Sequence, residues 1–164
     1  MSGEAPVARL LLLIAAGVWL GCESEDPSKF VGSWVYRNGA VKATCGSLSP
    51  SFDLAETSLA ITERDGALVA ESGGCRITLE LCGSSARGRS QNCTLTNKEI
   101  QANSTGDWEF VTTNGTTMKN KASGTAVLLL PGALPPIVCD HFDLSGDLMR
   151  SDGSLGSPAS SGKP

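Results

Sequence analysis

The residues best suited to acid–base chemistry gather near the C-terminal end of the chain. His141, the only histidine, stands between Asp140 and Asp143, with Asp147 close behind. A histidine beside carboxylates could serve a Ser-His-Asp hydrolase or a metal site. However, the chain has no Gly-x-Ser-x-Gly motif for a nucleophile, and a regular strand would turn Asp140 away from His141 and Asp143. We therefore interpret the group as surface positions and predict no catalytic residue, metal ligand or cofactor.

The cysteines are the second group of residues whose type could do chemistry, and the first of them is Cys22. Arg9 precedes an apolar run from Leu10 to Leu20, and Gly21 stands directly before Cys22. A basic start, a short apolar region and a small residue at the cut are typical of a secretory signal. Leu20-Gly21-Cys22 resembles the end of a bacterial lipobox, where signal peptidase II cleaves before a cysteine that carries diacylglycerol. The resemblance implies a signal peptide over residues 1–21 and lipidation of Cys22.

Two alternatives to the lipobox depend on the length and flanks of the apolar run. A transmembrane helix needs about 20 apolar residues, and this run is about half as long. An ordinary secretory signal remains open, although the general signal peptidase prefers a small residue three positions before the cut, where this chain has Trp19. A lipobox usually has Leu at that position, so Trp19 departs from both patterns.

Lipidation would determine the cellular location of the mature protein. Several acyl chains together hold a protein stably on a bilayer. Residues 22–29 would form a polar linker containing Pro27, and Glu23 follows Cys22 where enteric lipoproteins retained at the inner membrane carry Asp. We therefore expect a lipid-anchored protein of the bacterial cell envelope, at the outer membrane, whose membrane contact is the anchor.

Composition divides the remainder into one domain and a tail. Residues 151–164 are rich in Ser, Gly and Pro and predict a disordered tail. Residues 30–150 fit a single domain, with 12 acidic and 10 basic side chains and no basic cluster of the kind that binds nucleic acid.

The hydrophobic pattern of this domain indicates an all-β fold. Short alternating runs of Thr, Val, Leu and Ile are separated by turn residues such as Asn38-Gly39, Asp65-Gly66 and Asn114-Gly115. We predict an antiparallel meander that closes as a small barrel or packs as a two-sheet sandwich. The expected strands are Val31–Arg37, Ala40–Cys45, Ser58–Arg64, Ala67–Glu71, Cys75–Leu81, Arg89–Leu95, a strand through Trp108 and Phe110, Thr116–Lys121, Gly124–Leu130 and Ile137–Met149.

Outside the cytosol, disulfides are the expected state of the five cysteines that follow Cys22. A turn centred near Ser84 would place Cys75 opposite Cys93 on antiparallel strands. The spacing therefore favours a bridge between these two residues.

A second bridge would join the ends of the meander. Cys45 lies in an early strand and Cys139 in the last one, and these strands meet when a meander closes. Because lipidation of Cys22 leaves an odd number of cysteines, one thiol remains, and Cys82 at the end of its strand is our candidate for it.

Gly32-Ser33-Trp34 resembles the G-x-W signature at the first strand of lipocalins and related calycins. That resemblance implies a barrel in which the Trp closes one end. The whole chain also resembles small bacterial lipoproteins built from a lipobox, a short linker, a G-[ST]-W strand and Thr/Gly-rich strands that contain cysteines. This second resemblance implies no activity.

Two functions are consistent with these patterns. The first is a lipid-anchored, non-catalytic envelope protein that acts as a structural or protein-interaction module. The second is a calycin-like carrier that holds a small apolar ligand in a barrel cavity. No nucleic-acid partner is expected in either case.

Overall fold

The computed structural model describes residues 26–96, 101–129, 132 and 135–151. The predictions for the signal peptide, for Cys22 and for the tail beyond Ser151 lie outside these residues. None of the helices among the described residues is long and apolar enough to cross a membrane.

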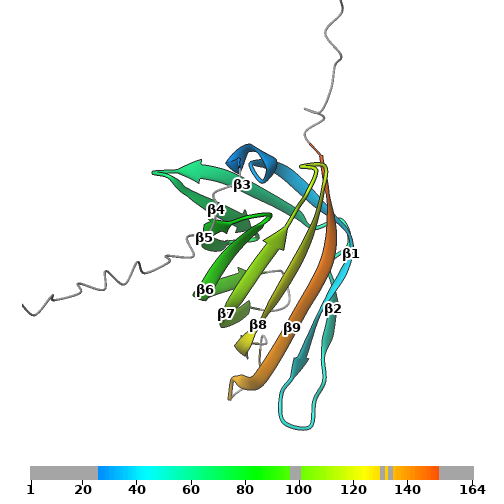
Figure 1. The fold of residues 1–164 in the computed structure, drawn as a ribbon. Coiled ribbons are helices and arrows are strands. Elements are labelled where there is room, and N and C mark those ends of the chain that lie inside the picture. The colour runs from blue at the N-terminus through cyan, green and yellow to red at the C-terminus, as the bar shows by residue number, and fades with distance from the viewer. Residues whose placement is uncertain (1–25, 97–100, 130–131, 133–134, 152–164) are drawn as a thin grey trace, which may run out of the picture.

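Antiparallel strands account for most of the described chain, as the alternating pattern predicts (Figure 1). A single 3-10 turn, η1 (Pro27–Lys29), precedes them. The strands are β1 (Gly32–Thr44), β2 (Ser51–Asp53), β3 (Ser58–Arg64), β4 (Ala67–Ser72), β5 (Cys75–Cys82), β6 (Ser85–Thr96), β7 (Gln101–Val111), β8 (Thr117–Leu129) and β9 (Ile137–Arg150).

The sheet closes into a barrel and not into a sandwich. Its order is β2-β1-β3-β4-β5-β6-β7-β8-β9, and β1 also pairs with β9. The barrel therefore contains β1 and β3 to β9, joined in sequence order, while β2 is an extra strand on β1. The long pairing of β1 with β9 runs from Trp34 opposite Arg150 to Thr44 opposite His141.

One predicted turn is wrong, because Asn38-Gly39 lies inside β1. The pairing of β1 with β9 shifts between Tyr36 and Asn38, which marks a β-bulge. Gly39 has φ 146° and lies opposite Gly146, so close that a Cβ on Gly39 would be 2.8 Å from the Gly146 Cα. Glycine is therefore needed here for a bend and a close strand approach, and not for a hairpin.

Two other predicted turns are confirmed. Asp65 and Gly66 have φ values of 53° and 79° and connect β3 to β4, as expected for an Asp-Gly hairpin. Asn114 lies between β7 and β8, and its side-chain oxygen accepts hydrogen bonds from the backbone N–H of Thr116 at 2.9 Å and of Thr117 at 3.0 Å.

The strands expected on either side of Gly124 form one strand, β8. Gly124 lies opposite Gly106 of β7, and a side chain on Gly124 would collide with the backbone of Thr105. The break in apolar alternation at Gly124 therefore reflects a close approach of two strands and not a strand end.

The first strand is preceded by a segment that the sequence assigns to the linker. Asp26 caps η1 and accepts hydrogen bonds from the backbone N–H of Ser28 at 2.9 Å and from its hydroxyl at 2.6 Å. Both bonds lower the pKa of Asp26. Residues 26–29 are thus part of the folded domain.

Candidate functional site

Trp34, the tryptophan of Gly32-Ser33-Trp34, lies near the start of β1 and opposite Arg150 at the end of β9. Its side chain is fully buried, and the indole Nε1–H donates a hydrogen bond to the carbonyl of Phe30 at 2.8 Å. Phe30 is also fully buried and lies between η1 and β1. This hydrogen bond therefore connects the segment that leads into β1 to the buried Trp34 side chain.

Arg150 at the end of β9 contacts the Trp34 side chain. Its guanidinium carbon lies 4.8 Å from the centre of the Trp34 ring, within the range of a cation–π interaction. The same guanidinium donates hydrogen bonds to carbonyl oxygens of two separate segments, at 2.6 Å to Gly115 and at 2.7 Å to Val31, 3.1 Å to Lys29 and 3.2 Å to Ser28. We refer to Arg150, Trp34 and these carbonyls as the Arg150 clamp.

No pattern in the sequence predicts the Arg150 clamp. Arg150 stands alone at the end of the last strand, and no motif in the sequence marks it. Its partners are backbone carbonyls, which every residue carries, so only the closed barrel shows that they converge on one side chain.

The barrel interior is lined with buried hydrophobic side chains that form one core cluster. Fully or nearly fully buried residues come from every barrel strand, and they include Trp34, Tyr36, Ile61, Leu68, Leu79, Ala86, Phe110, Met118, Phe142 and Leu148. The rings of Trp108 and Phe142 approach to 6.5 Å between centroids. Burial raises the pKa of the Tyr36 phenol well above its ordinary value.

Both predicted disulfides are confirmed. Cys75 bonds to Cys93 and Cys45 bonds to Cys139. All four residues are at most 5% exposed, so both bridges belong to the core. The second one joins the segment just after β1 to β9, at the seam where the barrel closes.

A bulge in β6 gives Cys93 its inward position. The pairing of β6 with β7 shifts between Gly88 and Gln91, and Ser90 in this bulge has φ 50°. The Ser90 N–H donates a hydrogen bond to the carboxylate of Asp107 at 2.8 Å. Inward residues are even-numbered before the bulge and odd-numbered after it, as the burial of Gly88 and Cys93 shows.

The prediction of a free thiol at Cys82 is wrong. No cysteine among the described residues is free, and Cys82 is disulfide-bonded. The prediction followed from an odd number of pairing cysteines, which holds only when one of the six is removed from pairing. Cys82 itself is half-buried at the end of β5.

The cluster around His141 lies on the outside of the barrel. The pairing of β9 with β8 shifts so that both Asp140 and His141 face Thr125, and both are exposed. Asp140 therefore does not point away from His141 as a regular strand would require. His141 Nε2 lies 2.9 Å from the Asp143 carboxylate, with side chains 54% and 68% exposed.

No set of three or more His, Cys, Asp or Glu side chains among the described residues is arranged to hold a metal ion.

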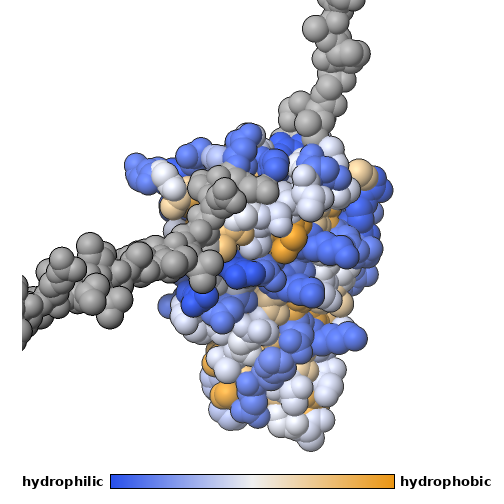
Figure 2. All heavy atoms as spheres, in the orientation of Figure 1, coloured by the Kyte–Doolittle hydropathy of each residue, from blue (hydrophilic) through white to orange (hydrophobic). Residues whose placement is uncertain are grey.

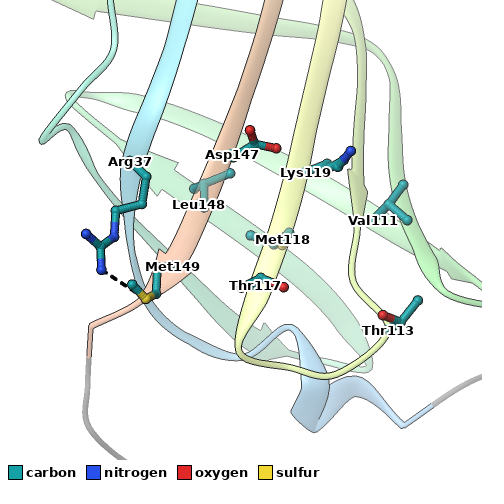
Figure 3. Close-up of a pocket in the computed structure, with 9 residues that line it drawn as sticks. All are labelled: Arg37, Val111, Thr113, Thr117, Met118, Lys119, Asp147, Leu148 and Met149. Carbon is teal, nitrogen blue, oxygen red and sulfur yellow. Dashed lines mark hydrogen bonds between the residues drawn. The ribbon is translucent and has the colours of Figure 1, made fainter.

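Open grooves are among the pockets that the described residues form. The groove of Figure 3 has a volume of about 400 Å3. It is lined by Arg37, Val111, Thr113, Thr117, Met118, Lys119, Asp147, Leu148 and Met149. The Arg37 guanidinium contacts the Met149 sulfur at 3.2 Å (Figure 3).

A second groove, of about 460 Å3, crosses β6 to β9 and contains an ion pair of 2.7 Å between Arg87 and Glu109. In Figure 2 hydrophobic side chains form only small patches between hydrophilic ones on the face shown.

Comparison of the chain with protein-family models, with curated proteins and with solved structures gave no match.

Proposed function

We propose that this protein is a lipid-anchored, non-catalytic module of the bacterial cell envelope that acts through the outside of its barrel. The observation that carries the proposal is the barrel interior, in which aromatic rings, aliphatic side chains and two disulfides pack together as one hydrophobic core. A rigid barrel with a polar outer wall is suited to contact with another macromolecule.

The anchor and the fold together orient the module. Extended chain spans at most about 3.5 Å per residue, so the short linker between Cys22 and η1 holds the Arg150 clamp within about 20 Å of the bilayer surface. The opposite end of the barrel, with the Cys45–Cys139 bridge, then points away from the membrane.

The edge of β2 is the best candidate for the partner contact. Every barrel strand has neighbours on both sides, whereas β2 pairs only with β1. Hydrogen bonds from Leu54 to Gly39 and from Ala43 to Pro50 flank this pairing, so Ser51 and Asp53 direct their backbone groups to the other side. An extended segment of a partner protein could add there as a further strand.

Partitioning of the mature protein tests the anchor. We expect the wild-type protein to enter the detergent phase of a Triton X-114 extraction and to incorporate a labelled fatty acid. The Cys22→Ala variant should lose both properties, while Ser24→Ala, a matched change in the same linker, should keep them. A wild-type protein that stays in the aqueous phase would contradict the proposal.

Peptide mapping under non-reducing conditions provides an independent test, because a lipidated sulfur cannot form a disulfide. Cys45, Cys75, Cys93 and Cys139 bond to one another. A diacylglycerol thioether on Cys22 supports the anchor. A peptide that joins Cys82 to Cys22 overturns the anchor.

The alternative is a calycin-like carrier of a small apolar ligand. The closed eight-strand barrel with an apolar inner wall and a fully buried Trp34 favours it. Organic extraction of protein purified from its native envelope, followed by mass spectrometry, tests this function. A stoichiometric apolar compound would support a carrier, and its absence together with no displaceable binding of a fluorescent fatty acid would exclude one.

A further inference from the structure

Two polar side chains inside the barrel have no hydrogen-bond partner. Asn120 of β8 is 1% exposed, and neither its side-chain oxygen nor its side-chain nitrogen has a partner within the part of the chain that the structure describes. Trp108 of β7 is 7% exposed, and its indole Nε1–H is also unpaired. By contrast, the buried Thr112 hydroxyl is bonded, to the carbonyl of Thr117 at 2.7 Å.

The unpaired groups belong to one layer of the barrel interior. Phe110 lies directly opposite Asn120, and Trp108 is two residues further along β7 on the same face. Diagonal neighbours of this kind are about 7–8 Å apart at the backbone and can be bridged by long or aromatic side chains. Gly146 lies opposite Asn120 on the other side and is covered by the ring of Tyr36.

An unpaired carboxamide in this position is unfavourable. A buried donor or acceptor without a partner loses its bonds to water and gains nothing in exchange, and native proteins retain few such groups. Asn120 presents both a donor and an acceptor, and Trp108 presents a donor. A guest that satisfies them must accept from N–H groups and donate to a carbonyl oxygen.

We propose that the barrel interior contains a binding site for a hydroxyl group, held by the Asn120 carboxamide and the Trp108 indole. A hydroxyl both donates and accepts, as the two side chains require, whereas a carboxylate only accepts and an ammonium only donates. No charged side chain is buried in this interior among the described residues, which further favours a neutral guest. The hydroxyl belongs either to water or to a small organic alcohol.

Thermal unfolding of Asn120→Leu tests the site by the sign of the effect. If a guest bonds to Asn120, the apolar replacement releases it and leaves the Trp108 indole without its shared partner, and we expect Tm to fall by about 4–8 °C. If Asn120 is truly unpaired, the replacement removes a buried polar group at no loss and Tm rises, which would overturn the proposal. Met118→Leu, on the same face of β8 and 2% exposed, is the matched control and should change Tm by less than about 3 °C.

A double-mutant cycle with Trp108→Phe tests whether one guest joins both side chains. The double variant should lose less than the sum of the two single losses, because the first substitution already releases the guest. Strict additivity would overturn a shared site.

Nuclear magnetic resonance of the unmodified protein tests the site without any substitution. We expect the Trp108 indole proton to be shifted downfield and protected from exchange. Cross-peaks to water identify water as the guest, and a compound recovered by extraction with cross-peaks to the indole identifies an organic alcohol. An indole proton that contacts neither, or that bonds to another side chain, overturns the proposal.

Discussion

Replacement of Arg150 by Met should cost this domain a large part of its stability. The substitution keeps the length and apolar stem of the side chain and removes the guanidinium. Four carbonyl oxygens, on Ser28, Lys29, Val31 and Gly115, then lose their donor. The ring of Trp34 loses the cation above it at the same time.

The size of the effect follows from these contacts. A hydrogen bond to a charged group contributes about 1.5–3 kcal/mol, and a cation–π contact adds about 0.5–2 kcal/mol. The four bonds share one guanidinium, and two of them exceed 3.0 Å, so they do not add in full. We expect a loss of about 3–5 kcal/mol in the free energy of unfolding, against about 5–15 kcal/mol for a whole domain.

Urea unfolding of three variants measures this loss. Arg150→Met should lower the midpoint with little change in slope, and near-ultraviolet circular dichroism should report a changed environment of Trp34. Arg150→Lys keeps the charge but cannot reach four carbonyls at once, so it should recover less than half of the loss. Arg37→Met removes an exposed arginine at the neighbouring strand and should cost less than about 0.5 kcal/mol. If Arg150→Met proves as mild as Arg37→Met, the Arg150 clamp does not hold the barrel end.

The remaining predictions concern the disulfides and the tyrosine. The bridges span 18 residues for Cys75–Cys93 and 94 residues for Cys45–Cys139. Chain entropy predicts that removal of the first bridge by paired Ala substitutions lowers the free energy of unfolding in urea by about 3 kcal/mol, and removal of the second by about 4.5 kcal/mol. The reverse order would refute an entropic origin. Tyr36 is an acid whose pKa is raised by burial in the folded state. The unfolded chain therefore releases this proton first, and stability should fall as the pH rises above about 10. Because Tyr36 is the only tyrosine, phenolate absorbance should appear together with unfolding, and Tyr36→Phe should lessen the loss of stability at alkaline pH. Phenolate formation in the still folded protein would contradict the burial argument.

Much of the fold follows from local sequence patterns. The alternation around Ile77 and Leu79 and the turn at Asp65-Gly66 each depend on residues that are close in the chain, and both are found where expected. The choice between a barrel and a sandwich does not follow from local patterns, because it depends on the pairing of β1 with β9 across most of the chain.

The residues of the candidate site likewise differ in whether the sequence alone predicts their contacts. Cys75 and Cys93 could be paired from the sequence because one turn separates them, and Cys45 and Cys139 because a closed meander brings its ends together. The polar position at Asn120 could not be found, since alternation alone marks it as one more inward residue of β8 and gives no sign of an unpaired carboxamide.

β-Bulges explain why regular alternation does not predict which side chains of β6 and β9 point into the barrel. The hairpin between β5 and β6 turns after Cys82, which lies opposite Ser85. That register, continued without interruption, would place Asn92 opposite Cys75 and turn the Cys93 thiol outward. The extra residue at the Ser90 bulge restores the match, so the disulfide depends on an irregularity and not on regular pairing.

The bulge at Asp140 and His141 does the reverse on β9, since it keeps two successive polar residues on the outer wall while Cys139 and Phe142 on either side point inward. An extra residue in a strand changes the face of every residue beyond it. In this barrel two such insertions decide which cysteines can meet in the core and which polar groups remain on the outer wall.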